Sequence, residues 1–135
     1  MRRFWTLSLA AAGAVACGVW AVESTRGTET PVKSALMHVV LFNLKGDAPP
    51  QAADDLIRDA HQMLAKVPVV TAVHAGRRAP GDRDVHVKDF DVALSLRLKR
   101  AGDVQAYLDH PLHVEFAQKH GQDVERIRVV DFYDE

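Results

Sequence analysis

Two kinds of hydrophobic periodicity organise the chain. In residues 37–44 both alternating faces are largely apolar, which predicts a β-strand that is covered on both sides. Residues 53–67 place apolar side chains at helical spacing, which predicts one face of an amphipathic helix that ends before Pro68. A domain of this size can cover one side of the strand with its own helices. We therefore expect another copy of the chain to cover the second side.

Further patterns complete one folded domain, expected over residues 35–135. Pro111 suits the first position of a helix and places His110 at its N-cap. Residues 90–98 alternate between apolar and polar or small side chains, as in a strand with one buried face. The other expected elements are a strand at 69–75 stopped by Gly76, a charged loop at 77–89, a short helix at 101–108, a helix from Pro111 to about His120 ended by Gly121, and a strand at 127–133.

The order of these elements is βαββαβ, with the second helical stretch in two parts. This is the ferredoxin-like α+β arrangement, a sheet with helices on one face. The opposite face stays open unless something packs on it. The chain is 26% charged and 47% hydrophobic with a net charge of -1. This composition fits a globular domain and provides no basic surface for nucleic acid.

The N-terminal segment is predicted to be a targeting signal rather than part of the folded domain. Arg2 and Arg3 precede 19 residues without a charge, which is the pattern of an export signal over residues 1–22. The polar residues 23–34 are then interpreted as a flexible linker. We therefore expect the domain outside the cytoplasm, in the periplasm or associated with the cell envelope.

Three fates of the N-terminal segment stay open. The small residues Ala14 and Ala16 suit cleavage of a signal peptide. The run Ala14-Val15-Ala16-Cys17 also resembles a lipobox, in which Cys17 becomes the lipidated first residue of a lipoprotein. An uncleaved membrane anchor is the third alternative. Since Cys17 is the only cysteine, no disulfide is expected in the folded domain.

Several of these segments resemble the stress-responsive A/B barrel (Dabb) domain family. Residues 37–42 resemble its opening strand and residues 130–132 its closing strand. The resemblance covers nearly all of residues 36–133 and implies a homodimer in which two four-stranded sheets close into one α/β barrel. The most specific match, to the family pattern Y-x-x-H-P-x-H-x-x-F, is the run Tyr107-Leu108-Asp109-His110-Pro111-Leu112-His113-Val114-Glu115-Phe116.

The resemblance also implies a site. The family contains plant stress proteins and olivetolic acid cyclase, a cofactor-free polyketide cyclase whose acting tyrosine and histidine fall on Tyr107 and His113. Val92 stands where that cyclase has a further pocket histidine, so polyketide cyclisation itself is not expected. The ligand-binding residues expected around the pair are His38, Val40, Phe42, His110 and Phe116.

Histidine and tyrosine suit acid–base chemistry on a carbonyl compound. His113 would act as a base near neutral pH, and Tyr107 would donate a hydrogen bond to a developing oxyanion. A purely structural interpretation competes, in which His110 caps a helix, His113 bonds a backbone carbonyl and Tyr107 fills the core. His110 and His113 lack a third metal ligand, so no metal site is predicted, and no cofactor is expected.

Three functions are compatible with the sequence. The first is an exported homodimer that binds a small apolar or aromatic molecule in its barrel, with a link to stress. The second is a cofactor-free enzyme of the cyclase, isomerase or lyase type that uses the His–Tyr pair on a carbonyl substrate. The third is a stress or stability module without a ligand. The expected partners are a second copy and a small molecule, without nucleic acid, and the membrane only through the N-terminal segment.

Overall fold

The structure, a computed structural model, describes residues 34–135. The expected signal segment, residues 23–33 of the expected linker, and Cys17 lie outside the described residues. Within residues 34–135, no helix is long and apolar enough to cross a membrane. The elements along the chain are β1 (Ala35–Leu44), α1 (Ala52–Met63), a 3₁₀ turn (Leu64–Lys66), β2 (Val70–Arg77), β3 (Val92–Leu98), a second 3₁₀ turn (Ala101–Asp103), α2 (Val104–Leu108), α3 (Pro111–Gly121) and β4 (Val124–Asp134).

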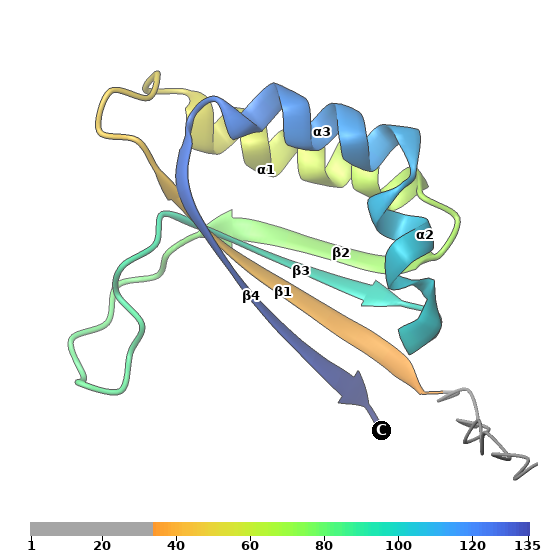
Figure 1. The fold of residues 1–135 in the computed structure, drawn as a ribbon. Coiled ribbons are helices and arrows are strands. Elements are labelled where there is room, and N and C mark those ends of the chain that lie inside the picture. Colours follow the sequence, from red (N-terminus) through yellow and green to blue (C-terminus); the bar gives the residue numbers. More distant parts are fainter. Residues whose placement is uncertain (1–33) are drawn as a thin grey trace, which may run out of the picture.

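The four strands form one antiparallel sheet in the order β2-β3-β1-β4. Helices α1 and α3 lie side by side across one face of this sheet, and the short helix α2 connects β3 to α3 (Figure 1). This is the ferredoxin-like βαββαβ arrangement, with the second helical stretch divided as expected. The predicted α+β class is therefore confirmed.

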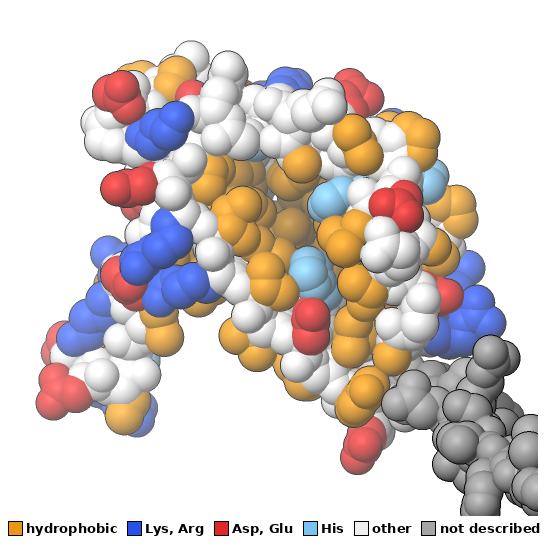
Figure 2. Space-filling model, viewed as in Figure 1, with side chains coloured by type: hydrophobic (Ala, Val, Ile, Leu, Met, Phe, Trp, Pro, Cys, Tyr) orange, Lys and Arg blue, Asp and Glu red, His pale blue; other side chains and the backbone are white. Residues whose placement is uncertain are grey.

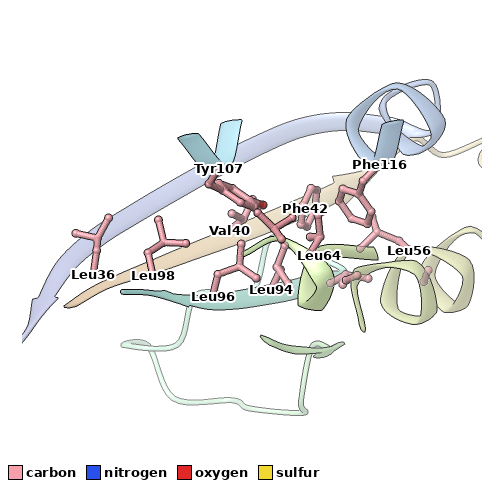
Figure 3. Packing of buried hydrophobic residues seen from close by; sticks show 14 residues of the cluster. Leu36, Val40, Phe42, Leu56, Leu64, Leu94, Leu96, Leu98, Tyr107 and Phe116 are labelled. Atoms are coloured by element: carbon pink, nitrogen blue, oxygen red, sulfur yellow. The ribbon is translucent and has the colours of Figure 1, made fainter. Parts of the chain in front are cut away.

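The alternation along the strands decides which side chains enter the core. In β1 and β3 the even-numbered residues point toward the helices, and Leu94 and Leu96 of β3 are 1% and 0% exposed. Helix α1 covers them with Leu56, Ala60 and other apolar side chains at helical spacing. The side chains that line the core from β1, α1, β3, α2 and α3 are seen in Figure 3, among them Leu36, Val40, Phe42, Leu56, Leu64, Leu94, Leu96, Leu98, Tyr107 and Phe116.

No helix of the described residues covers the other face of the sheet (Figure 1). This face carries Met37, Val39 and Leu41 of β1, and opposite them on β4 lie Val130 and Phe132, which are 55% and 50% exposed. We call these five residues the open face. Exposed apolar side chains gathered on one surface are typical of an interaction site. The helices thus account for one apolar side of the first strand, and the second side is only half-buried in the single chain.

Several element boundaries differ from the expectation based on sequence. Strand β1 begins at Ala35, two residues earlier than expected, and the helix expected over residues 53–67 is α1 to Met63 followed by a 3₁₀ turn. Strand β2 does not stop at Gly76 but runs to Arg77, because Gly76 remains paired with Ala93 of β3. Strand β3 begins at Val92, two residues later than expected. Strand β4 begins at Val124, three residues earlier than expected, because its pairing with β1 continues beyond a shift in register. The differences in β2, β3 and β4 depend on pairing between strands, which short sequence patterns do not contain.

Candidate functional site

A cavity of about 200 Å³ lies between the sheet and helices α2 and α3. Figure 2 shows a hollow surrounded by hydrophobic side chains, with histidine side chains at its edge. A ligand was expected inside a two-sheet barrel, but this cavity lies on the helix-covered side of the sheet, and one chain forms it alone. Its lining comprises His38, Val40, Phe42, Leu94, Tyr107, Leu108, His113, Phe116, Ala117, His120, Gly121, Val124, Ile127 and Val129.

Tyr107 reaches the cavity from α2 and is buried. Its side chain extends toward the sheet beside Val40 and Phe42 (Figure 3). Burial raises the pKa of the Tyr107 phenol well above its ordinary value. The hydroxyl therefore keeps its proton at neutral pH and is available as a hydrogen-bond donor.

His113 lies in the first turn of α3, with its ring centroid 4.5 Å from that of Tyr107. Its Nδ1–H donates to the carbonyl oxygen of Leu108 at 2.8 Å, because a carbonyl only accepts. Burial lowers the pKa of His113 and outweighs the opposing effect of that hydrogen bond, and the nearby His38 lowers it further. The imidazole is therefore neutral at pH 7, with Nε2 as an unprotonated acceptor, which is the form that a general base requires.

His38 enters the cavity from the middle of β1, and its ring centroid lies 5.8 Å from that of Tyr107. Its Nδ1–H donates to Oδ1 of Asp131 at 2.7 Å. The register of the sheet places Asp131 directly opposite His38, on β4. A carboxylate bound to one ring nitrogen orients a histidine and leaves the other nitrogen as an acceptor. Asp131 is thus a residue of the site that the sequence did not reveal, since 93 positions separate it from His38.

Three polar groups belong to residues that line the cavity. Within residues 34–135, the one side-chain nitrogen or oxygen that is sealed from solvent without a partner is Nε of Arg128. The Tyr107 hydroxyl and the Nε2 atoms of His38 and His113 have no partner in this part of the chain and are not among such sealed atoms, and all three residues line the cavity. Together they form a small polar cluster on the otherwise apolar wall of the cavity.

The structure brings most of the expected site residues together. His38, Val40, Phe42, Tyr107, His113 and Phe116 all line the one cavity. His110 does not line it. Its ring accepts a hydrogen bond from the N–H of Leu112 at 3.2 Å, and it is the N-cap of α3, as Pro111 at the first helical position indicated. The structure therefore gives His110 a capping contact rather than the expected contact with a ligand.

Sequence reasoning missed several residues of the cavity. Ile127 and Val129 of β4 face it because they pair with Phe42 and Val40. His120 lines it from the end of α3, although no sequence spacing distinguished this histidine. For metal ions, the described residues contain no group of three or more His, Cys, Asp or Glu side chains that could hold one.

The fold and the site define a class of protein, namely ferredoxin-like α+β domains that enclose a small apolar cavity with histidine and tyrosine on its wall. The family model of the stress responsive A/B barrel domain matches residues 36–134. The chain belongs to this family, and the resemblance seen in the sequence is confirmed. No curated protein matches the chain.

Solved structures with the same fold come from several organisms. A dimeric protein of unknown function with a ferredoxin-like fold from Bacteroides fragilis is 22% identical, with a TM-score of 0.62 over 73% of this chain and 95% of that chain. A Dabb family protein from Mesorhizobium loti is 23% identical, with a TM-score of 0.60 over 73% and 95%. The hydroxynitrile lyase from Passiflora edulis is 19% identical, with a TM-score of 0.64 over 76% and 95%. At these identities the likeness establishes a shared fold.

Proposed function

We propose that the protein binds a small, mainly apolar ring compound carrying a carbonyl group in the cavity between its sheet and helices. The observation that carries this proposal is the convergence of His38, Tyr107 and His113 on a wall that is otherwise apolar. A few placed polar groups in an apolar cavity are typical of ligand sites. An apolar cavity of about 150 Å³ holds benzene, so a cavity of about 200 Å³ suits one substituted ring. The Tyr107 hydroxyl would donate to the carbonyl oxygen.

Benzaldehyde is a suitable probe, and we expect ligand-observed NMR to detect millimolar or tighter binding to the wild-type protein. Ala117 is exposed and lines the cavity, so Ala117→Trp is expected to obstruct it and weaken binding about tenfold or more, a loss of about 1.4 kcal/mol. Gln118→Trp is the matched control, because Gln118 is an exposed neighbour that does not line the cavity. Equal binding by both variants would exclude this cavity as the site.

We also infer that the protein acts as a homodimer joined through the open face. The Bacteroides fragilis neighbour is a dimeric protein of the same fold. In this chain the open face is apolar and Val130 and Phe132 are about half exposed, which a soluble monomer rarely tolerates in one patch. Two such sheets packed face to face would form the α/β barrel and leave each cavity on the outer side of its own sheet.

A second candidate function is a cofactor-free enzyme that moves a proton beside a carbonyl group. It is favoured by the lowered pKa of His113, whose neutral ring lies 4.5 Å from the ring of Tyr107. In this scheme His113 Nε2 removes a proton from the carbon beside the carbonyl. The electron pair moves to the carbonyl oxygen, where the Tyr107 hydroxyl stabilises the charge, and the proton then returns. The lyase named above shows that this fold supports a reaction.

Deuterium exchange at the benzylic carbon of phenylacetone, followed by NMR in D₂O, tests this scheme. We expect His113→Gln to slow the catalysed exchange by a factor of about 10² to 10⁴. The wild-type rate should rise with pH with its midpoint below the ordinary histidine value of 6.5, because the pKa of the base is lowered. His61→Gln, an exposed histidine of α1, is the control and should leave the rate unchanged. An unchanged rate in His113→Gln would remove the enzyme hypothesis.

For localisation, we propose that residues 1–22 carry the domain out of the cytoplasm and that residues 23–34 link it to a processed or anchored end. Mass spectrometry of the chain isolated from its own cell envelope separates the three fates. Lipidated Cys17 adds acyl mass that Cys17→Ala loses, cleavage shortens the chain, and an uncleaved anchor leaves full-length chain in the membrane fraction. Full-length chain in the cytosolic fraction would contradict export.

A further inference from the structure

The cavity has a second polar contact far from Tyr107, formed by His120 at the end of α3. His120 is 5% exposed and lines the cavity, and its ring lies against that of Phe116 with centroids 4.8 Å apart. The site described above does not use this histidine. Its surroundings give the ring a defined orientation.

The orientation of His120 comes from Asp59, a buried carboxylate on α1. His120 Nε2–H donates to Oδ2 of Asp59 at 3.0 Å, and Lys119 Nζ and Arg58 Nη2 lie 2.7 and 3.2 Å from the same carboxylate. Burial raises the pKa of Asp59, but the hydrogen bonds from Lys119 and His120 outweigh it, so the net pKa is below the ordinary value. The carboxylate is therefore charged at neutral pH and accepts the hydrogen on Nε2 of His120.

This tautomer leaves Nδ1 of His120 with a lone pair. Nδ1 has no hydrogen-bond partner within residues 34–135. It is also not sealed from solvent, because Nε of Arg128 is the one side-chain nitrogen or oxygen in this part of the chain that is both sealed and unpaired. Because His120 lines the cavity and its Nε2 is engaged by Asp59, Nδ1 is the ring nitrogen left for a molecule bound there. An unprotonated ring nitrogen accepts hydrogen bonds, so the group that suits this position is a donor such as a hydroxyl.

The spacing along α3 places His120 at a defined distance from His113, whose ring lies beside that of Tyr107. His113 and His120 are seven residues apart, which is almost two turns, so they lie on one helix face with an axial separation of about 10 Å. Phe116 lies between them on the same face. A single ring with substituents at opposite positions, together with a hydrogen bond of about 2.8 Å at each end, spans a comparable length.

We propose that the cavity selects ring compounds with two oxygen functions at opposite ends, a carbonyl that accepts from Tyr107 and a hydroxyl that donates to Nδ1 of His120. Asp59 positions His120 and fixes its acceptor atom, and Phe116 contacts the ring between the two ends. The ligand class is thus a hydroxyaryl carbonyl compound. This inference rests on the proposed binding function and adds the chemistry of the ligand to it.

The test compares the affinities of three probes, benzaldehyde, 3-hydroxybenzaldehyde and 4-hydroxybenzaldehyde, by titration followed by NMR. We expect the wild-type protein to bind 4-hydroxybenzaldehyde about tenfold more tightly than benzaldehyde, as one additional hydrogen bond allows, and to prefer it to the 3-hydroxy isomer. In His120→Phe, which keeps a ring beside Phe116, the ratio of the two affinities is expected to fall to about one. In Tyr107→Phe both probes should weaken while their ratio persists.

The outcomes separate this inference from the proposed function. Binding of benzaldehyde without any preference for the 4-hydroxy compound would overturn the role of His120 and leave the cavity as a ligand site. A preference that persists in His120→Phe would also overturn it. Absence of binding by all three probes would contradict the binding function itself. The comparison of hydroxyl positions uses the wild-type protein alone, so it decides the question even if His120→Phe does not fold.

Discussion

Replacing Leu96 by alanine is expected to lower the free energy of unfolding by about 2–5 kcal/mol. Leu96 is 0% exposed and lies on β3 in the middle of the sheet, paired with His38 on one side and Val73 on the other. The rigid sheet cannot collapse around the lost side chain, so a cavity adds to the lost burial. For a domain with a total stability of about 5–15 kcal/mol, this is a large fraction.

The measurement is chemical denaturation of Leu96→Ala and wild type at one protein concentration, because association of subunits adds to apparent stability. Val85→Ala is the control. Val85 is 74% exposed in the loop between β2 and β3, and its truncation should change stability by less than about 0.5 kcal/mol. Equal effects of the two substitutions would contradict the packing described here. The result also bears on function, because Leu96 pairs with His38, which lines the cavity.

Replacing Val130 by aspartate is expected to convert the proposed homodimer to monomers. Val130 is 55% exposed in the single chain and pairs with Val39 in the centre of the open face. In the dimer an aspartate would be buried there without a partner, which costs several kcal/mol. A cost of about 4 kcal/mol corresponds to a dissociation constant about a thousandfold higher.

Size-exclusion chromatography with light scattering at micromolar concentration measures this change directly. Val114→Asp is the matched control, because Val114 is 38% exposed on α3, on the other side of the molecule from the open face. The control should remain a dimer. A wild-type monomer, or a dimeric Val130→Asp, would mean that the open face is not the subunit interface. Because each chain forms its cavity alone, monomeric Val130→Asp should still bind benzaldehyde.

The proposed homodimer interface and the cavity lie on opposite sides of the same sheet. In β1 the odd-numbered residues Met37, Val39 and Leu41 belong to the open face, while His38 and Val40 line the cavity. Such an interface would account for the second apolar side of the first strand. This arrangement also means that association and ligand binding can be disrupted separately, which makes the two proposals independent in experiment.

Much of the fold follows from local sequence. The helical spacing of residues 53–67 predicted the helical segment that contains α1, because each turn of a helix brings residues three and four positions apart onto one face. His110 before Pro111 predicted the start of α3, because capping involves neighbouring residues only. The association of Tyr107 with His113 was also contained in one short motif.

The remaining features were decided by tertiary structure. Asp131 contacts His38 and Asp59 contacts His120, over separations of 93 and 61 residues. The continuation of β2 through Gly76 likewise depends on its partner strand. Register and helix packing bring such residues together, and they result from the burial of the whole core rather than from any local pattern. The sequence by itself determined the elements, their order and the Tyr–His pair, while the tertiary structure decided the location of the cavity and the carboxylates that orient its histidines.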